Sequence, residues 1–404
     1  LLSLSKHASC VILDDYPTYT PNKILRAAPK ILKLRVDAVD SNGILPMMWA
    51  EKEFTTAYSF RKYMQKSLVD ALQTIPAMNS MDGVEDNLSL TSDDLEFLRE
   101  ETGLEATPLE WLWRVAEGGT VGDRAMADFP IDHSVPAVKE TIGGIDEARM
   151  RLQKFLNYKL NKYSIDRNNP DTPAVSGLSP WLHFGHISSF EIIEKVFAKE
   201  NWSVDSLNHE DTGKGTRSGW WGTSESASSF LDQIITWREL GFNFAYNRID
   251  HATIETIPNW AKISMTEHIN DNRTLYSLEE LEQAETHDEI WNASQRELLR
   301  TGQMHNYMRM LWGKKILEWS PDPETAAERM IYINDKWALD GRDPNSYTGI
   351  FWVLGRHDRA WGPERPIFGK VRYMSSESAM RKLKLKNYLE RYAKEDTMTL
   401  AKFG

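Results

Sequence analysis

The sequence predicts a small, incomplete α/β unit followed by a large all-helical domain. Two observations lead to this fold class. A single strand–helix–strand pattern occupies the first 45 residues, and helical periodicity runs through almost everything after residue 143. With 404 residues, 41% of them hydrophobic, the chain is long enough for two or three domains with dry cores. The 15 tryptophans outnumber the 14 tyrosines and the 14 phenylalanines, which indicates a protein that uses indoles.

The α/β pattern begins with the apolar run 8–13, which Asp14 and Asp15 end as they would end a buried parallel strand. A helix is expected over 22–28 and a second strand over 34–39. One such unit is too small for a doubly wound domain, so only part of a Rossmann-like α/β domain is predicted, over residues 1–75. The acidic, irregular stretch that follows is predicted as an inter-domain linker over residues 76–140.

The helical domain is predicted over residues 141–404. Residues 145–163 and 225–246 carry apolar side chains at helical spacing, and no strand-like alternation persists in this part. Residue pairs typical of helix starts support the prediction: Ser277 with Glu280 and Thr286 with Glu289 as capping boxes, and Asp322 with Pro323 as cap and first-turn proline.

Composition narrows the function classes. No run of 18 apolar residues occurs, so no membrane span is expected. A lone cysteine, Cys10, fits a reducing compartment, and without a visible signal peptide we expect a cytoplasmic location. The formal charge is −11, but residues 365–394 hold nine basic residues against two acidic ones. This basic block is compatible with contacts to nucleic-acid phosphates, and equally with a solvated helix.

Several kinds of chemistry lack a motif. Zinc-hydrolase, serine-hydrolase and Rossmann dinucleotide motifs are missing from the sequence, and the Gly-, Ser- and Thr-rich insertion 201–226 does not have phosphate-loop spacing. His183 and His186 lie three residues apart, but no carboxylate stands at a matching spacing. We therefore expect no metal site.

The densest chemical signal is a set of tryptophans. Trp312 and Trp319 are seven residues apart, so on one helix they share a face, and Trp291 lies on the helix before it. Indoles are readily oxidised, so such a row can carry an electron between solvent and a buried redox cofactor. Aromatic residues of a helical core would give the same spacing.

Four long segments carry a family resemblance: residues 176–189, 237–244, 286–319 and 334–375. They resemble class II cyclobutane pyrimidine dimer photolyases, nearly continuously from about residue 143 to 392. Residues 8–60 resemble the later half of that family's N-terminal antenna domain, whose earlier half has no counterpart here. The resemblance implies light-driven repair of pyrimidine dimers in UV-damaged DNA, by a protein expected to be a monomer. It leaves the antenna chromophore undetermined.

The resemblance also implies a cofactor, a non-covalently bound, U-shaped FAD that is active as the reduced anion in the helical domain. Asn334 is expected at the flavin N5, and Arg309 and Asp340 beside the isoalloxazine, where a cation offsets the anionic charge. Trp312, Trp291 and Trp319 match the family's photoreduction tryptophans. The phosphate contacts are expected from Tyr163, Ser176, Gly177, Leu178 and Ser179.

For the lesion, the resemblance implies that the carboxyl group of Glu239 hydrogen-bonds the flipped dimer. Met310 and Trp352 match apolar walls of the dimer pocket, which replace base stacking. Phe242 stands where related enzymes can carry tryptophan. The candidates for DNA phosphate contacts are Lys370, Arg372, Arg381 and Lys382.

Two alternatives share the flavin domain. A cryptochrome-type photoreceptor would bind FAD without repairing DNA. A repair enzyme for (6-4) lesions would need histidine acid–base help, for which His305 is available.

Overall fold

The computed structural model describes residues 2–6, 8–73, 92–103, 131–139 and 141–394. The chain forms two compact units, one from 1–41 with 75–137 and the other from 42–74 with 138–404. Residues 42–74 thus pack within the helical unit, and much of the predicted linker lies outside the described residues. The domain division 1–75, 76–140 and 141–404 stays a prediction.

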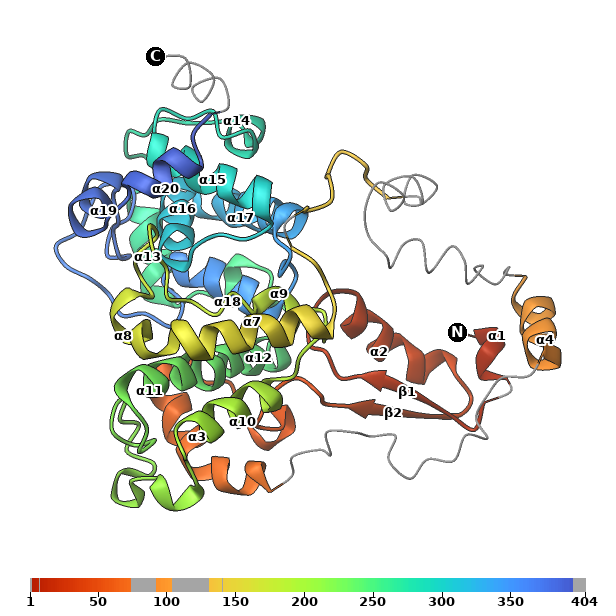
Figure 1. The fold of residues 1–404 in the computed structure, drawn as a ribbon. Helices are drawn as coiled ribbons and strands as arrows, with labels where there is room; N and C mark the ends of the chain where they lie inside the picture. The colour runs from red at the N-terminus through yellow and green to blue at the C-terminus, as the bar shows by residue number, and fades with distance from the viewer. Residues whose placement is uncertain (1, 7, 74–91, 104–130, 140, 395–404) are drawn as a thin grey trace, which may run out of the picture. The chain divides into compact units, whose positions relative to one another are not determined.

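The first unit contains a two-stranded parallel sheet (Figure 1), with β1 (Cys10–Asp14) paired to β2 (Arg35–Val39). The described residues of this unit form three helices: α1 (Leu2–Ser5), α2 (Tyr19–Ile31) and α4 (Ser92–Thr102). The predicted strand–helix–strand order is therefore confirmed. The predicted burial of the first strand is wrong, because Ile12 is 66% exposed and the described sheet has no third strand to cover it.

The second unit is helical. Its described elements are η1 (Met47–Trp49), α3 (Ala57–Leu72), α7 (Ile145–Tyr158), η2 (Leu160–Lys162), α8 (Tyr163–Asp166), α9 (Ser179–His183), α10 (Ser189–Lys199), η3 (Val204–Ser206), η4 (His209–Asp211), α11 (Glu225–Leu231), η5 (Asp232–Trp237), α12 (Arg238–Asn247), η6 (Ile254–Thr256), α13 (Asn259–Glu267), α14 (Leu278–Glu282), α15 (Glu289–Thr301), α16 (Asn306–Glu318), α17 (Pro323–Trp337), α18 (Pro344–Val353), α19 (Ser376–Lys382) and α20 (Lys386–Arg391).

Side-chain caps fix several of these helix starts. Ser277 forms the predicted capping box with Glu280. The box predicted for Thr286 with Glu289 is wrong, because Asp288 caps α15 and accepts the N–H groups of residues 290 and 291. The Thr286 hydroxyl instead donates to the side chain of Asn292 at 2.8 Å. Aspartate outcompetes threonine here because its carboxylate reaches two orphan donors at once.

Two hydrophobic cores hold the helical unit together. One joins α3 and residues 44–57 to helices α7–α12, and the other lies among helices α13–α20. Four of the largest fully buried side chains are tryptophans, namely Trp181, Trp220, Trp291 and Trp319. In the described residues no helix is long and apolar enough to cross a membrane.

Candidate functional site

The turn between α15 and α16 brings several predicted cofactor residues together. Gly302 ends α15 in the left-handed conformation, with φ at 64°, and its carbonyl accepts the N–H of Leu339 at 2.8 Å. A Cβ on Gly302 would lie 2.5 Å from the Leu339 side chain, so only glycine permits this approach. The contact holds the loop that follows α17 against the turn between α15 and α16.

That loop places Asp340 beside Arg309, as the resemblance implied. An Nη atom of Arg309 lies 3.4 Å from Oδ1 of Asp340, and both side chains are only partly exposed. The Ser346 hydroxyl donates to the Asp340 backbone carbonyl at 2.9 Å and so fixes the loop. The guanidinium therefore keeps a fixed position on the exposed side of α16.

Asn334 lies on α17 one turn before this loop and is 5% exposed. Its amide is 3.4 Å from the carboxylate of Asp335, which also accepts the backbone N–H of Arg342 at 3.0 Å. Burial raises the pKa of Asp335, and its hydrogen-bond donors oppose that rise. The same loop therefore contacts Asp335, the neighbour of Asn334, through Arg342, and Arg309 through Asp340.

His305, which caps the start of α16, lies at the same turn. Its Nε2 donates to the carbonyl of Arg167 at 3.0 Å, and its buried Nδ1 has no hydrogen-bond partner among the described residues. Burial lowers the pKa of His305 to about 4, so the ring is neutral near pH 7. The guanidinium of Arg167 lies 5.7 Å from the ring centre of Tyr163, one of the predicted phosphate contacts.

The predicted phosphate turn, Ser176 to Ser179, ends at α9. Gly177 has φ at 66°, and a Cβ there would lie 4.0 Å from the side-chain oxygen of Gln303, in the same α15–α16 turn. Leu178 is 1% exposed, whereas Ser179 is exposed. The sequence did not single out Gln303 or Arg167. The fold brings Gln303 near Gly177 and Arg167 near Tyr163, and no sequence pattern predicts these contacts.

The three predicted redox tryptophans form one connected row. The indole N–H of Trp312 donates to the Gln295 side chain at 2.8 Å, and that of Trp291 donates to the Trp312 carbonyl at 3.0 Å. The rings of Trp291 and Trp319 meet edge to face with centres 5.4 Å apart. All three are buried, with exposed fractions of 3%, 0% and 1% for Trp312, Trp291 and Trp319.

A π-helical segment, η5, precedes the helix that carries Glu239. Residues 225–246 were predicted as one periodic segment, and the structure divides them into α11, η5 and α12. The extra residue per turn in such segments redirects the side chains that follow and often marks a functional site. Glu239 is 4% exposed, and its carboxylate accepts the backbone N–H groups of Ile44 at 2.6 Å and Leu45 at 3.1 Å.

Phe242 lies one turn further along α12 and is 2% exposed, with the guanidinium of Arg238 4.5 Å from its ring centre. It lines a small cavity together with Glu239, Gly43 and Tyr63. The predicted lesion residues Glu239 and Phe242 therefore share one cavity wall.

Trp352, on α18, stacks on Trp237 with ring centres 4.6 Å apart and planes 13° from parallel. Sequence reasoning missed Trp237, although its position in the segment 237–244 was a usable signal. Helices α12 and α18 approach closely at Gly241, where a Cβ would lie 2.7 Å from the Asn345 side chain. Met310 is half-buried on α16.

Two of the four predicted phosphate-contact residues, Arg372 and Lys382, line a second hollow. Arg381 and Lys382 end α19 on the surface, and the exposed Lys370 is paired with Glu364 at 3.2 Å. The guanidinium of Arg372 lies 5.2 Å from the ring centre of Trp361. A cleft of about 290 Å³ is lined by aromatic and basic side chains that include Tyr307, Trp361, Arg365, Arg372, Tyr373 and Lys382.

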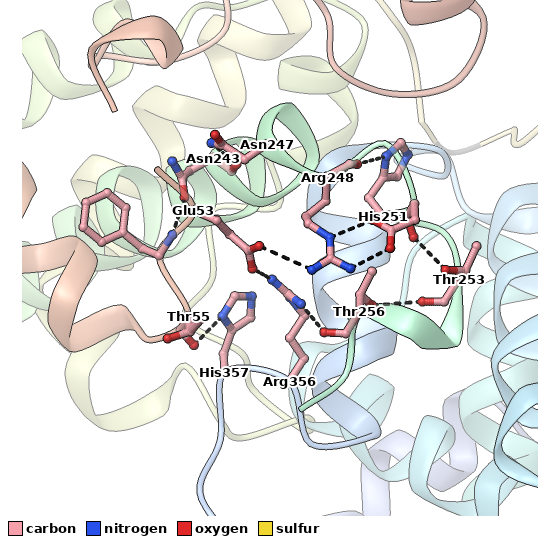
Figure 2. A network of polar contacts seen from close by, with 12 residues as sticks. Glu53, Thr55, Asn243, Asn247, Arg248, His251, Thr253, Thr256, Arg356 and His357 are labelled. Atoms are coloured by element: carbon pink, nitrogen blue, oxygen red, sulfur yellow. Dashed lines mark hydrogen bonds and ion pairs between the residues drawn. The ribbon is translucent and has the colours of Figure 1, made fainter. Parts of the chain in front are cut away.

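A charged network joins residues 53–55 to the segment after α18 (Figure 2). Glu53 accepts hydrogen bonds from Arg356 and lies 3.7 Å from Arg248. Nδ1 of His357 donates to the carbonyl of Thr55 at 2.9 Å. Burial and the charge of Arg356 lower the pKa of His357 to about 3. The network fixes the chain just beyond Trp352.

His183 and His186 do not form part of a metal site in the described residues, where no group of three metal-ligating side chains occurs. Nδ1 of His186 accepts the backbone N–H of Gly144 at 3.1 Å. His183 lies 3.6 Å from the carboxylate of Asp343, the residue that caps α18.

Comparisons with known proteins agree on one family, although no family model matches the chain. The deoxyribodipyrimidine photo-lyase of Arabidopsis thaliana is 32% identical over 395 residues, which cover 95% of this chain and 70% of the relative. That of Methanothermobacter thermautotrophicus is 40% identical over 277 residues, covering 68% and 56%. That of Potorous tridactylus is 35% identical over 297 residues, covering 73% and 50%.

A class III photolyase from Agrobacterium tumefaciens shares the fold, with a TM-score of 0.58 and 16% identity over 96% of this chain and 68% of that one. The chain belongs to the deoxyribodipyrimidine photo-lyase family. It spans about half of two of the relatives above and 70% of the Arabidopsis one. The resemblance seen in the sequence is confirmed at the level of the family.

Proposed function

We propose that this chain repairs cyclobutane pyrimidine dimers in DNA with blue light, as a photolyase of class II. The observation that carries the proposal is the turn between α15 and α16. It gathers the Arg309–Asp340 pair, His305 and the Gly177 turn, and the buried tryptophan row begins one turn further along α16. Because the chain belongs to the photo-lyase family, we interpret this arrangement as the binding site of the flavin cofactor.

The residues at this turn fit an anionic dinucleotide such as FAD. Nδ1 of His305 is buried and without a partner among the described residues, and because Nε2 carries the proton of the neutral ring, Nδ1 can accept one hydrogen bond from a ligand. Arg309 and Arg167 supply positive charge, and the glycine at position 177 lets the backbone come close. Tyr163, Ser176, Leu178 and Ser179 remain proposed contacts to its phosphates.

Bound FAD, reduced, supplies a photoexcited electron to the dimer. The protein's own part is electrostatic and positional. Arg309 places a cation, held by Asp340, next to the proposed flavin site, which stabilises negative charge there. Asn334 presents an amide that can donate or accept at the flavin N5. The tryptophan row lies on and just after helices α15 and α16, and α16 also carries Arg309.

On the lesion side, the stacked pair of Trp237 and Trp352 offers the aromatic surface that an extruded dimer needs in place of its stacked neighbours. Met310 is the proposed second wall. Glu239 is the proposed hydrogen-bonding carboxyl, although its carboxylate also holds the backbone at Ile44 and Leu45. Phe242 lines the same cavity as that carboxyl.

We propose that the second hollow, near α19, belongs to the DNA interface. Basic residues fix the backbone of DNA through its phosphates, and aromatic side chains provide stacking surfaces for unpaired bases. Arg372 and Lys382 line the cleft of about 290 Å³, Arg381 precedes Lys382 in the last turn of α19, and Lys370 is exposed. A local basic block keeps this attraction despite the overall charge of −11, because distant charges are screened in salt.

The first unit is proposed to be part of an antenna domain of Rossmann-like type, with its light-harvesting chromophore undetermined. A monomer in the cytoplasm stays the expectation for this chain.

The test is blue-light irradiation of the chemically reduced, flavin-loaded protein with an oligonucleotide that carries one thymine dimer. Repair is followed by the return of thymine absorbance, with a dark sample and an undamaged oligonucleotide as controls. We expect repair only in the irradiated sample. Bound flavin without repair would favour the cryptochrome-type photoreceptor. Repair of an oligonucleotide with a (6-4) lesion in place of the thymine dimer would favour the (6-4) repair enzyme.

A further inference from the structure

The short helix α20, near the end of the described chain, has buried contacts that lead to the proposed flavin site. It packs against α15 (Figure 1), and its Tyr388 is 1% exposed. The Tyr388 hydroxyl donates to Oε2 of Glu297 on α15 at 2.6 Å. Just beyond the helix, Arg300 donates to the carbonyl of Ala393 at 2.8 Å. A helix of six residues has little stability of its own, so these tertiary contacts hold it in place.

Glu297 connects α20 to the start of α16. The carboxylate oxygen that binds Tyr388 also accepts the backbone N–H of His305 at 3.0 Å. Burial raises the pKa of Glu297, whereas the hydrogen bonds from Tyr388 and His305 and the charge of Arg309 oppose that rise. One buried oxygen therefore joins the C-terminal helix to the turn that carries the proposed cofactor residues.

A second connection runs from the loop 167–175 to the start of α20. Asp171, in this loop, is 8% exposed, and its carboxylate accepts the backbone N–H groups of Tyr388 at 2.8 Å and Asn387 at 3.2 Å. These N–H groups lie in the first turn of α20, where the helix itself offers them no acceptor. The loop leads directly into the predicted phosphate turn, Ser176 to Ser179, so Asp171 fastens the approach to that turn.

The two connections close a ring of hydrogen bonds. Nε2 of His305 donates to the carbonyl of Arg167, at the start of the same loop, at 3.0 Å. From His305 the ring continues through Glu297 to Tyr388, and the N–H of Tyr388 returns to the loop at Asp171. The side chains of these last four residues are at most 9% exposed, so water competes little for their hydrogen bonds.

We propose that Tyr388, Glu297 and Asp171 are positioning residues that hold α20 against the flavin site and so slow the release of bound FAD. They act through His305 and through the loop that precedes the phosphate turn. If α20 opened locally, both would lose a hydrogen-bonded neighbour, and FAD would leave more easily. The inference rests on the proposed function, since it names residues that retain the cofactor of the same site.

The first measurement is the rate at which oxidised FAD leaves the flavin-loaded full chain, followed by the rise of free-flavin fluorescence after dilution. Tyr388→Phe keeps the ring but loses the hydroxyl. We expect it to release FAD about tenfold faster than the wild type, because a hydrogen bond to a carboxylate contributes a free energy of that order. Asp171→Asn, which keeps one acceptor oxygen, should release FAD at a rate between the two.

The matched control is Gln65→Leu on α3, which also removes buried hydrogen bonds but lies outside the ring. Gln65 is 1% exposed, accepts the N–H of Gly215 at 2.8 Å and donates to the carbonyl of Thr216 at 3.1 Å. Urea unfolding should show a loss of stability similar to that of Tyr388→Phe, whereas FAD should leave at the wild-type rate. A wild-type rate in Tyr388→Phe, or equal rates in Tyr388→Phe and Gln65→Leu, would overturn the proposal.

The second measurement is hydrogen exchange of the loop 167–175 in the flavin-free full chain, read by mass spectrometry. The N–H groups of Asn169 and Ala174 donate to the carbonyl of Asp166 at 3.0 and 3.4 Å, so opening of the loop would expose them. Exchange should be faster in Tyr388→Phe and unchanged in Gln65→Leu. A wild-type chain that binds no FAD would count against the proposed function alone. Unchanged exchange in Tyr388→Phe would overturn the role of α20 whether or not FAD binds.

Discussion

Glu239 has a structural contact and a proposed role at the lesion, and substitutions can separate the two. The resemblance gives its carboxyl to the lesion, whereas the structure shows it accepting the N–H groups of Ile44 and Leu45, which are 1% and 4% exposed. In Glu239→Ala both buried donors lose their acceptor. An unsatisfied buried polar group costs about 1–3 kcal/mol, so the free energy of unfolding should fall by about 2–6 kcal/mol.

Asn243 provides a matched control one turn further along α12. Its amide accepts the N–H of Phe54 at 2.9 Å and donates to the carbonyl of Lys52 at 3.0 Å. It is 3% exposed and holds the same segment of chain, but only the Phe54 donor is buried. Asn243→Ala should therefore cost about 1–3 kcal/mol. Glu239→Gln, which keeps one acceptor oxygen, should lie in the same range.

The assay combines urea unfolding with the repair yield per bound flavin at saturating dimer oligonucleotide. If the Glu239 carboxyl acts on the lesion, Glu239→Gln should repair less per bound flavin than Asn243→Ala, although the two are similarly stable. Equal yields in these two variants would show that Glu239 acts by anchoring the chain alone. Wild-type stability in Glu239→Ala would refute the structural reasoning itself, because the two backbone donors would then not depend on the carboxylate.

Three further outcomes are expected. The carboxylate of Asp232 lies 2.8 Å from the guanidinium of Arg61, and both are buried. Asp232→Asn leaves that guanidinium without its charged partner, so urea unfolding should show that the free energy of unfolding falls by about 3–5 kcal/mol. For the control Asp211→Asn, in a partly exposed ion pair, it should fall by at most about 1 kcal/mol. Burial lowers the pKa of Lys314 from 10.5 to about 7, so between these two pH values the unfolded chain binds more protons than the folded chain. The free energy of unfolding should therefore rise in this range by up to about 1.4 kcal/mol per pH unit. Urea titrations of Lys314→Met should lack this rise. Trp312→Phe should block photoreduction of oxidised flavin, followed by its visible spectrum, but spare repair by chemically reduced protein; photoreduction at the wild-type rate would remove Trp312 from the row.

Helical spacing predicted that the three tryptophans lie together, because their contacts are made within and between two helices that follow each other in the chain. Trp312 and Trp319 lie two turns apart on and just after α16, and Trp291 lies on the helix joined to it by a short turn. Neighbouring antiparallel helices bring such residues together whatever the rest of the fold does.

The contacts of Glu239, His305 and Glu53 could not be predicted in the same way. Glu239 binds backbone groups 194 and 195 residues away, His305 binds a carbonyl 138 residues away, and Glu53 meets Arg356 over a separation of 303 residues. A backbone N–H or C=O has no sequence signature, since every residue except proline carries both. Sequence can name the side chain that needs a partner, but not the segment that supplies it.

These distant anchors show which segment of the chain supports helix α12. Glu239, Asn243 and Arg356 hold residues 44–54 by hydrogen bonds to the backbone at 44, 45 and 54 and to the side chain of Glu53. The segment that follows β2 is therefore fastened to the helical unit at three points within about ten residues. The lesion-side helix α12 depends on that segment, because two of its buried polar side chains find their partners there. All of these partners lie within residues 44–54, so we expect the position of α12 to depend on this segment.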